Sequence, residues 1–186
     1  MYQTLPDLYE LTAVCEIDDQ RRNKFVDQIG VGFQTNQLES LFSQDLDLID
    51  ICTPSALHFS QAAAALEAGF HVVLEKPVAR SLSEMDELER LEQQSGKRIF
   101  PIFQYRFGHG IQKLHHLIAK GLAGSPSMAT AETHWMRGEA YYSRKMWSST
   151  WDGATGGSFA THAIHIHDLL CQVLGDPTSV LSLIHI

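Results

Sequence analysis

The sequence has no long apolar run and no block of basic residues. Its longest apolar stretches, such as residues 62–66 and 99–103, are far shorter than the about 20 residues that a helix needs to cross a bilayer. Lysine and arginine total 14 against 22 acidic residues, and they do not gather into a surface for a polyanion. These absences predict a globular protein that spans no membrane and binds no nucleic acid.

Cysteine is also scarce. Cys15, Cys52 and Cys171 are far apart, and each lies in apolar sequence. Dispersed cysteines in odd number are typical of buried thiols in a reducing compartment, whereas a disulfide framework needs an even and regular set. Met1 is not followed by the basic and apolar regions of a signal peptide. We therefore expect a cytoplasmic protein.

Strand-like and helical patterns alternate over the first hundred residues. Asp18 precedes an amphipathic stretch that Gly30 closes, and Ser81 with Glu84 forms a capping box before another. Pro101 cannot donate to a strand ladder, so its strand belongs at an edge or a bulge. Such alternation predicts a parallel sheet with ligands at the carboxyl ends of its strands. The predicted strands are residues 10–15, 46–52, 71–74 and 98–104, and helices are expected between residues 18 and 30, 56 and 68, and 81 and 96.

The pattern changes after Arg106. The segments that follow are a helix over residues 111–119, a strand-like stretch over 128–135, an aromatic loop and a helix from about 157 to 174. We predict an α/β fold in which an incomplete Rossmann-type parallel sheet is followed by the start of an α+β substrate domain. Residues 1–105 would form the partial dinucleotide-binding domain and residues 106–186 the partial substrate domain.

Glycine is missing where a dinucleotide-binding fold needs it. Glu16 ends the first predicted strand, where such a fold places an acid that accepts hydrogen bonds from the adenosine ribose. The glycine-rich turn belongs about 20 residues before that acid, which is further than the sequence extends. Gly108 and Gly110 are no replacement, since the third glycine is absent. We expect a chain that starts after this turn; a solvated turn acid is the alternative interpretation of Glu16.

Two charged residues, Glu75 and Lys76, follow the apolar strand at residues 71–74. Charged groups at the end of a central strand are costly to desolvate unless they have partners or a task. At a nicotinamide site the Lys76 cation would stabilise a developing alkoxide. Taken by itself, the pair is more typical of an ion pair at the rim of a sheet.

Four motifs resemble those of the Gfo/Idh/MocA oxidoreductases, the family of glucose-fructose oxidoreductase and inositol dehydrogenase. They are the turn at residues 53–58 (Thr-Pro-Ser-Ala-Leu-His), the strand and turn at residues 69–77 (Gly-Phe-His-Val-Val-Leu-Glu-Lys-Pro), Tyr-Arg-Phe at residues 105–107, and the segment from Gly156 to Asp168. The motifs occur in the family's order and cover nearly the whole chain. A chance match of all four is improbable, although any one would be weak.

The resemblance implies a catalytic pair, Lys76 and His165. It also implies a cofactor site and a cis peptide bond before Pro77. The expected cofactor-binding residues are Glu16, Thr53, Pro54, Ser55, His58, Glu75, Lys76 and Pro77. Ser55 stands where the family usually has asparagine, and it keeps a shorter polar group.

Thr161 occupies a position where the family commonly has aspartate, four residues before His165. Residues four apart share a face of an α-helix, so Thr161 can lie beside His165 and bond to substrate. It cannot supply a carboxylate. We include Thr161 among the catalytic residues, and His162 is the alternative for the orienting role.

Substrate contacts are expected near the same helix. The predicted substrate-binding residues are Arg106, Trp151, His162 and Asp168. Aromatic residues of the loop at 141–151 could stack on a sugar or fill a groove between the domains. His162, His165 and Asp168 also recur at a spacing of three, but a zinc site would need further ligands from a second segment, so no metal is predicted.

Together the residues and the resemblance predict an NAD(P)-dependent dehydrogenase that moves hydride between nicotinamide and a sugar, polyol or related hydroxylated substrate. NAD is the expected cofactor because Glu16 would repel a 2′-phosphate, although Arg21 and Arg22 are close enough in sequence to favour NADP. The alternative is a non-catalytic, dinucleotide-binding regulatory protein of the same fold. We expect the complete protein to be a homo-oligomer, and residues 1–186 alone to be inactive.

Overall fold

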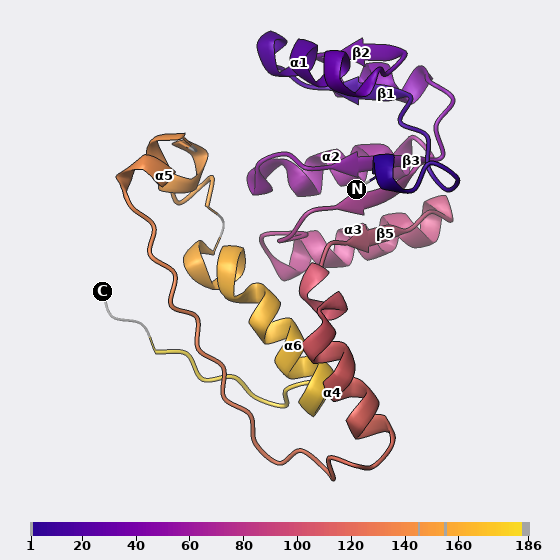
Figure 1. The fold of residues 1–186 in the computed structure, drawn as a ribbon. Coiled ribbons are helices and arrows are strands. Elements are labelled where there is room, and N and C mark those ends of the chain that lie inside the picture. The colour runs from indigo at the N-terminus through magenta and orange to yellow at the C-terminus, as the bar shows by residue number, and fades with distance from the viewer. Residues whose placement is uncertain (1, 145, 155, 184–186) are drawn as a thin grey trace. The chain divides into compact units, whose positions relative to one another are not determined.

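The computed structural model describes residues 2–144, 146–154 and 156–183 (Figure 1). The chain forms two compact units. The first unit comprises residues 1–51, 59–73 and 86–100, and the second comprises residues 52–58, 74–85 and 101–186. The second unit therefore contains the segments that directly follow three of the strands, together with the later helices.

The first unit begins with a pair of parallel strands. β1 (Ala13–Cys15) pairs in register with β2 (Phe33–Thr35), and α1 (Asp19–Ile29) connects them and contacts β1. Asp18 caps α1, since its Oδ1 accepts a hydrogen bond of 2.9 Å from the Arg21 N–H. Gly30 ends the helix in the left-handed conformation, with φ +80°. The predicted helix boundaries are confirmed here.

A second sheet has the strand order β3-β4-β5. Its strands are β3 (Leu48–Ile51), β4 (His71–Leu74) and β5 (Ile99–Pro101). The crossovers are the helices α2 (His58–Glu67) and α3 (Leu82–Ser95). A parallel sheet with helical crossovers confirms the Rossmann-type α/β fold (Figure 1). Within the described sheet, Pro101 lies on the edge strand, as its missing N–H requires.

The core of the first unit is built from small and branched side chains. On α2, Ala62, Ala65 and Leu66 have no exposed surface, and neither does Val72 on β4. Alanine lets a helix approach a sheet closely, and a buried leucine or valine contributes about 1.5–3 kcal/mol. This packing fixes the strands whose ends lead into the second unit.

Helices dominate the second unit. After a short 3₁₀ segment at Gln104–Phe107 come α4 (His109–Ala119), α5 (Glu139–Arg144) and α6 (Ile164–Leu174). A π-helical turn, Phe159–Ala163, leads directly into α6, and α6 packs against the 3₁₀ segment. Among the described helices, none combines the length and apolar character that a membrane span requires.

Two expectations were wrong, and one strand was missed. Residues 128–135 were expected to form a strand, but residues 124–138 are neither helix nor strand, because no described segment pairs with them. β2 was missed, since three residues are too few to show a period. The cysteines are not buried: Cys52 is exposed and the other two are half-buried, because all three lie at the ends of their elements or on partly solvated faces.

Candidate active site

Lys76 lies at the carboxyl end of β4 and reaches the turn before α6. Its Nζ donates to the backbone carbonyl of Thr161 at 2.5 Å, and its backbone N–H donates to the Glu75 carboxylate at 3.2 Å. The Lys76–Pro77 peptide bond is cis, as expected. The predicted catalytic lysine and the predicted catalytic helix are thus brought together within the second unit.

His165 is nearly enclosed at the start of α6. Its side chain is 3% exposed, the Tyr105 ring stacks on it at 4.6 Å, and Phe103 meets it edge-on at 6.0 Å. Burial lowers the pKa of His165, and the positive charge of Lys76 lowers it further. The ring is therefore neutral near pH 7 and able to accept a proton. Its buried Nδ1 has no hydrogen-bond partner in the described part of the chain.

Thr161 contributes its backbone rather than a free side chain. The Oγ1 donates to the Gly157 carbonyl at 2.6 Å and lies 2.9 Å from Nδ1 of His162. A hydroxyl has one proton to donate, so a bond to Gly157 requires that the His162 Nδ1–H donates to Thr161. In the π-helical turn, the Thr161 carbonyl therefore points to Lys76, and the Thr161 hydroxyl accepts a hydrogen bond from His162.

Arg106 and Asp168 bind each other. The guanidinium donates to both carboxylate oxygens, at 2.8 Å from Nε and 2.5 Å from Nη2, and it lies 5.0 Å from the centre of the Phe103 ring. A bidentate pair of this kind is directional as well as charged. It fixes the segment that carries Tyr105 to α6, and so keeps the Tyr105 and Phe103 rings in contact with His165.

His58 connects the turns after β3 and β4. Only 1% of it is exposed; Nδ1 lies 2.7 Å from the Pro77 carbonyl and Nε2 lies 2.9 Å from the Thr53 carbonyl. Ser55, 5% exposed, donates to the Gly153 carbonyl at 3.1 Å. The ring of His58 is enclosed by backbone, so it positions the turn that carries Thr53, Pro54 and Ser55.

Gly153 must be glycine for this arrangement to exist. A Cβ at this position would lie 2.0 Å from the Trp147 carbonyl oxygen, which is far inside van der Waals contact. The sequence offered no signal for this role, because a single loop glycine has no characteristic spacing. Tyr105 and Phe103 were missed as partners of His165 for a related reason, since they were read as part of a motif and a strand.

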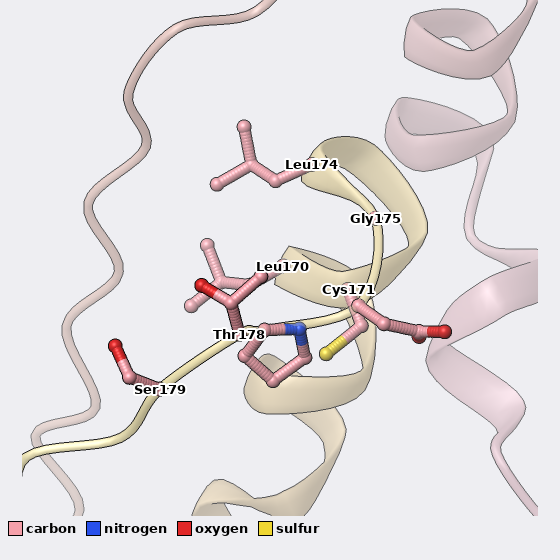
Figure 2. A pocket seen from close by; sticks show the side chains of 8 residues that line it. Leu170, Cys171, Leu174, Gly175, Thr178 and Ser179 are labelled. Carbon is pink, nitrogen blue, oxygen red and sulfur yellow. The ribbon is translucent and has the colours of Figure 1, made fainter.

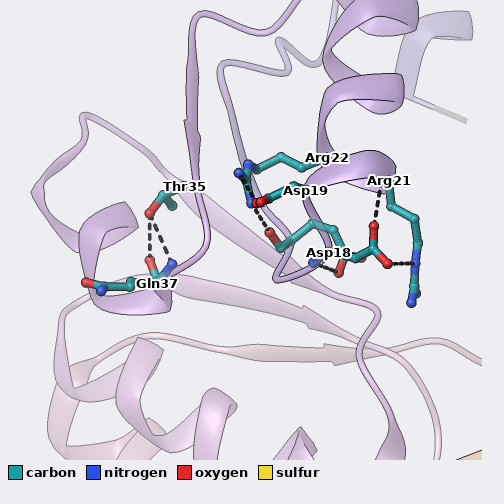
Figure 3. A network of polar contacts seen from close by, with 7 residues as sticks. Asp18, Asp19, Arg21, Arg22, Thr35 and Gln37 are labelled. Atoms are coloured by element: carbon teal, nitrogen blue, oxygen red, sulfur yellow. Dashed lines mark hydrogen bonds and ion pairs between the residues drawn. The ribbon is translucent and has the colours of Figure 1, made fainter.

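Glu16 lies in the first unit, directly after β1. Its Oε1 accepts from the Asp18 N–H at 3.0 Å, and its carbonyl accepts from Nη1 of Arg22 at 2.7 Å. Arg22 also binds Asp19 at 2.5 Å, and Arg21 lies 3.4 Å from Asp18. Figure 3 shows both arginines turned toward neighbouring acids, with Thr35 and Gln37 bonded to each other at the end of β2.

Two family models match the chain. "Oxidoreductase family, NAD-binding Rossmann fold" covers residues 1–103, and "GFO/IDH/MocA C-terminal domain" covers residues 111–185. The chain belongs to the Gfo/Idh/MocA oxidoreductase family. The first model alone matches more than half of its length.

Relatives of known name agree with this membership. D-glucoside 3-dehydrogenase of Escherichia coli is 27% identical over 95% of this chain and 49% of its own, and inositol 2-dehydrogenase of Salmonella paratyphi B is 30% identical over 64% and 36%. The WlbA dehydrogenase of Chromobacterium violaceum, solved with NADH and UDP-GlcNAcA, is 31% identical over 93% and 50%, with a TM-score of 0.86. The chain spans half or less of the length of these relatives.

A nicotinamide dinucleotide, the cofactor class of this Gfo/Idh/MocA chain, fits some of its residues. Glu16 directly follows β1, and the buried Nδ1 of His165, close enough to Lys76 for its charge to lower the pKa of the ring, has no hydrogen-bond partner among the described residues. No glycine occurs before Glu16, so this chain supplies no glycine turn for the pyrophosphate. Glu75 and the turn at Thr53 would border the nicotinamide end.

Trp151, one of the predicted substrate-binding residues, is 87% exposed. No group of three or more possible metal ligands lies together among the described residues.

A hollow lies between the carboxyl end of α6 and residues 175–179, with Leu170, Cys171 and Leu174 on its wall (Figure 2). It is at the opposite end of α6 from His165, so it is no part of the catalytic arrangement.

Proposed function

We propose that the complete gene product containing this chain is an NAD-dependent dehydrogenase of sugar hydroxyls. The observation that carries the proposal is the pairing of Lys76, held by the Thr161 carbonyl, with a buried and neutral His165. A cation and a base with a lowered pKa, side by side, are what removal of a hydroxyl proton requires.

In this proposal His165 accepts the proton of the substrate hydroxyl. The Lys76 ammonium donates a hydrogen bond to the same oxygen and stabilises its developing negative charge. The nicotinamide ring, when bound, supplies the acceptor for the hydride that leaves the carbon. The Tyr105 and Phe103 rings exclude water from one side of the base, which strengthens the electrostatic effect of Lys76.

The proposed cofactor is NAD rather than NADP. Glu16 directly follows β1, which is where a Rossmann fold carries the acid that binds the ribose hydroxyls, and there the added negative charge of a 2′-phosphate would be unfavourable. Arg22 is held by Asp19 and the Glu16 carbonyl, and Arg21 is beside Asp18, so acids already compensate both cations.

We also propose that the two domains divide between residues 105 and 106. The complete protein is proposed to be a homo-oligomer in the cytoplasm, where the exposed thiol of Cys52 would stay reduced.

The proposed substrate class is a sugar joined to a nucleotide. Two WlbA dehydrogenases, from Chromobacterium violaceum and Bordetella pertussis, were solved with NADH and UDP-GlcNAcA, and both align to this chain with TM-scores of 0.86.

A regulatory protein without turnover is the second candidate function. Thr161 favours it, because a threonine at this position supplies no carboxylate to orient His165.

The experiment is a substrate screen with the complete gene product. NADH formation is measured with UDP-GlcNAcA, UDP-GlcNAc, a D-glucoside and myo-inositol, with NAD and with NADP. Turnover of a UDP-linked sugar with NAD is the expected result. Tight NAD binding without turnover of any hydroxylated substrate would instead support the regulatory protein.

A further inference from the structure

Arg137, in the second unit, contacts two aromatic rings. The guanidinium carbon of Arg137 lies 5.2 Å from the centre of the Trp135 ring and 5.0 Å from the centre of the Tyr141 ring. Contact with aromatic faces restrains a guanidinium and leaves its N–H edge available for a planar acceptor. We call Trp135, Arg137, Tyr141 and His162 the arginine cage.

The charge of Arg137 is not compensated by an acid in the described part of the chain. Its one hydrogen bond there is a 3.3 Å contact from Nη1 to the Met136 carbonyl. By contrast, Arg22, Arg80, Arg90 and Arg106 each bind a carboxylate. A guanidinium has five N–H donors, so most of those on Arg137 are available for an anion.

The cage adjoins the anchor of the catalytic lysine. The Trp135 ring meets His162 edge-on at 5.5 Å, and Tyr141 lies 6.3 Å from the same ring. His162 is bonded to Thr161, whose carbonyl binds Lys76. All of these residues belong to the second unit, so one chain of contacts leads from the cage to the proposed reaction centre.

We infer that the arginine cage binds an anionic group of the substrate and so selects anionic sugar derivatives over neutral sugars. The inference rests on the proposed function, since it names the class of substrate for the same site. A guanidinium fork matches a carboxylate or a phosphate in two parallel hydrogen bonds. The anion is therefore either a carboxylate on the sugar ring or the diphosphate of a sugar nucleotide.

Binding measurements without cofactor test the inference. The complete gene product is titrated by calorimetry with UDP-GlcNAcA, UDP-GlcNAc, free glucuronic acid and methyl glucoside. Arg137→Gln should weaken UDP-GlcNAcA binding by about tenfold or more, the effect of losing a charged hydrogen bond. Arg137→Lys should lose less, because it keeps the charge but not the fork. Arg90→Gln, on α3 and paired with Glu87, is the matched control and should change nothing.

The ligands separate the two sources of the anion. A loss confined to UDP-GlcNAcA and glucuronic acid assigns the cage to the ring carboxylate, and an equal loss for both UDP-linked sugars assigns it to the diphosphate. Unchanged binding of every ligand in Arg137→Gln, or an equal loss that includes methyl glucoside, overturns the inference. This experiment measures binding alone. If Arg137 proves to bind no anion, the proposed dehydrogenase activity is unaffected, because the substrate screen tests that activity separately.

Discussion

The surroundings of Glu16, in the first unit, and those of Lys76, in the second unit, are built in different ways. Around Glu16 the side-chain hydrogen bonds join residues two to six positions apart. Around Lys76 the bond to Thr161 spans 85 positions, and the bond from Ser55 to Gly153 spans 98. The surroundings of Glu16 are therefore organised by neighbours in the sequence, whereas those of Lys76 form only when distant segments have packed together.

Removing the proposed base should have the largest effect. His165→Ala in the complete gene product should lower kcat for oxidation by about 10² to 10⁴-fold, the range for a lost general base. Steady-state kinetics with a turned-over sugar measure the effect, and His167→Ala, two positions along α6, is the control. Retention of most of the activity in His165→Ala would assign the base to another group, with His162 next.

The pH profile sharpens the same point. His165 must be neutral to accept a proton, and its pKa lies below the usual 6.5 because of burial first and Lys76 second. Oxidation should therefore rise with pH through a midpoint below 6.5 and stay level above it. Removing the cation in Lys76→Met should raise the pKa of His165, which NMR titration of its ring can follow. A midpoint above 6.5 in the unaltered protein contradicts the assignment.

Removing the lysine should have the next largest effect. Lys76→Ala should lower kcat by about 10² to 10³-fold, as the loss of an oxyanion donor does, and leave NAD affinity nearly unchanged. The matched control is Lys113→Ala, an exposed lysine on α4. Calorimetry with NAD and turnover measurements separate binding from catalysis, and equal losses in both would place Lys76 in cofactor binding alone.

The long-range clamp between Arg106 and Asp168 should affect stability more than chemistry. Arg106→Met leaves the Asp168 carboxylate, 10% exposed, without two hydrogen bonds, and should lower the free energy of unfolding by about 1–3 kcal/mol. Breaking the exposed pair with Glu87 in Arg90→Met should lower the free energy of unfolding much less, because solvent screens both charges. Urea denaturation compares them, and equal effects would show that the clamp is no stronger than a surface pair.

Substitution of Glu16, which is held by its neighbours in the sequence, should give the smallest effect. Glu16→Gln removes a negative charge but keeps the shape, so the preference for NAD over NADP, as a ratio of kcat/KM, should fall about fivefold, corresponding to about 1 kcal/mol. Asp27→Asn, an exposed acid on α1, serves as the control. An unchanged ratio would mean that Glu16 does not face the ribose.

Most of the fold could be predicted because its signals are local. The N-cap at Asp18, the left-handed Gly30 and the Pro101 edge strand follow from the chemistry of single residues, and they appear where expected. The region at residues 128–135 could not be judged this way. A strand needs a partner to satisfy its backbone, and a propensity does not show whether one is present.

The sequence by itself determined the alternation of strands and helices, the family and the identity of the proposed catalytic pair. Only the tertiary structure decided that Thr161 binds Lys76 through its backbone, that Arg106 and Asp168 bind each other, and that Tyr105 stacks on His165. The physical reason is the separation in sequence over which each interaction acts. Capping and periodicity act over a few residues, whereas a side chain's partner and its degree of desolvation depend on which distant segments pack around it.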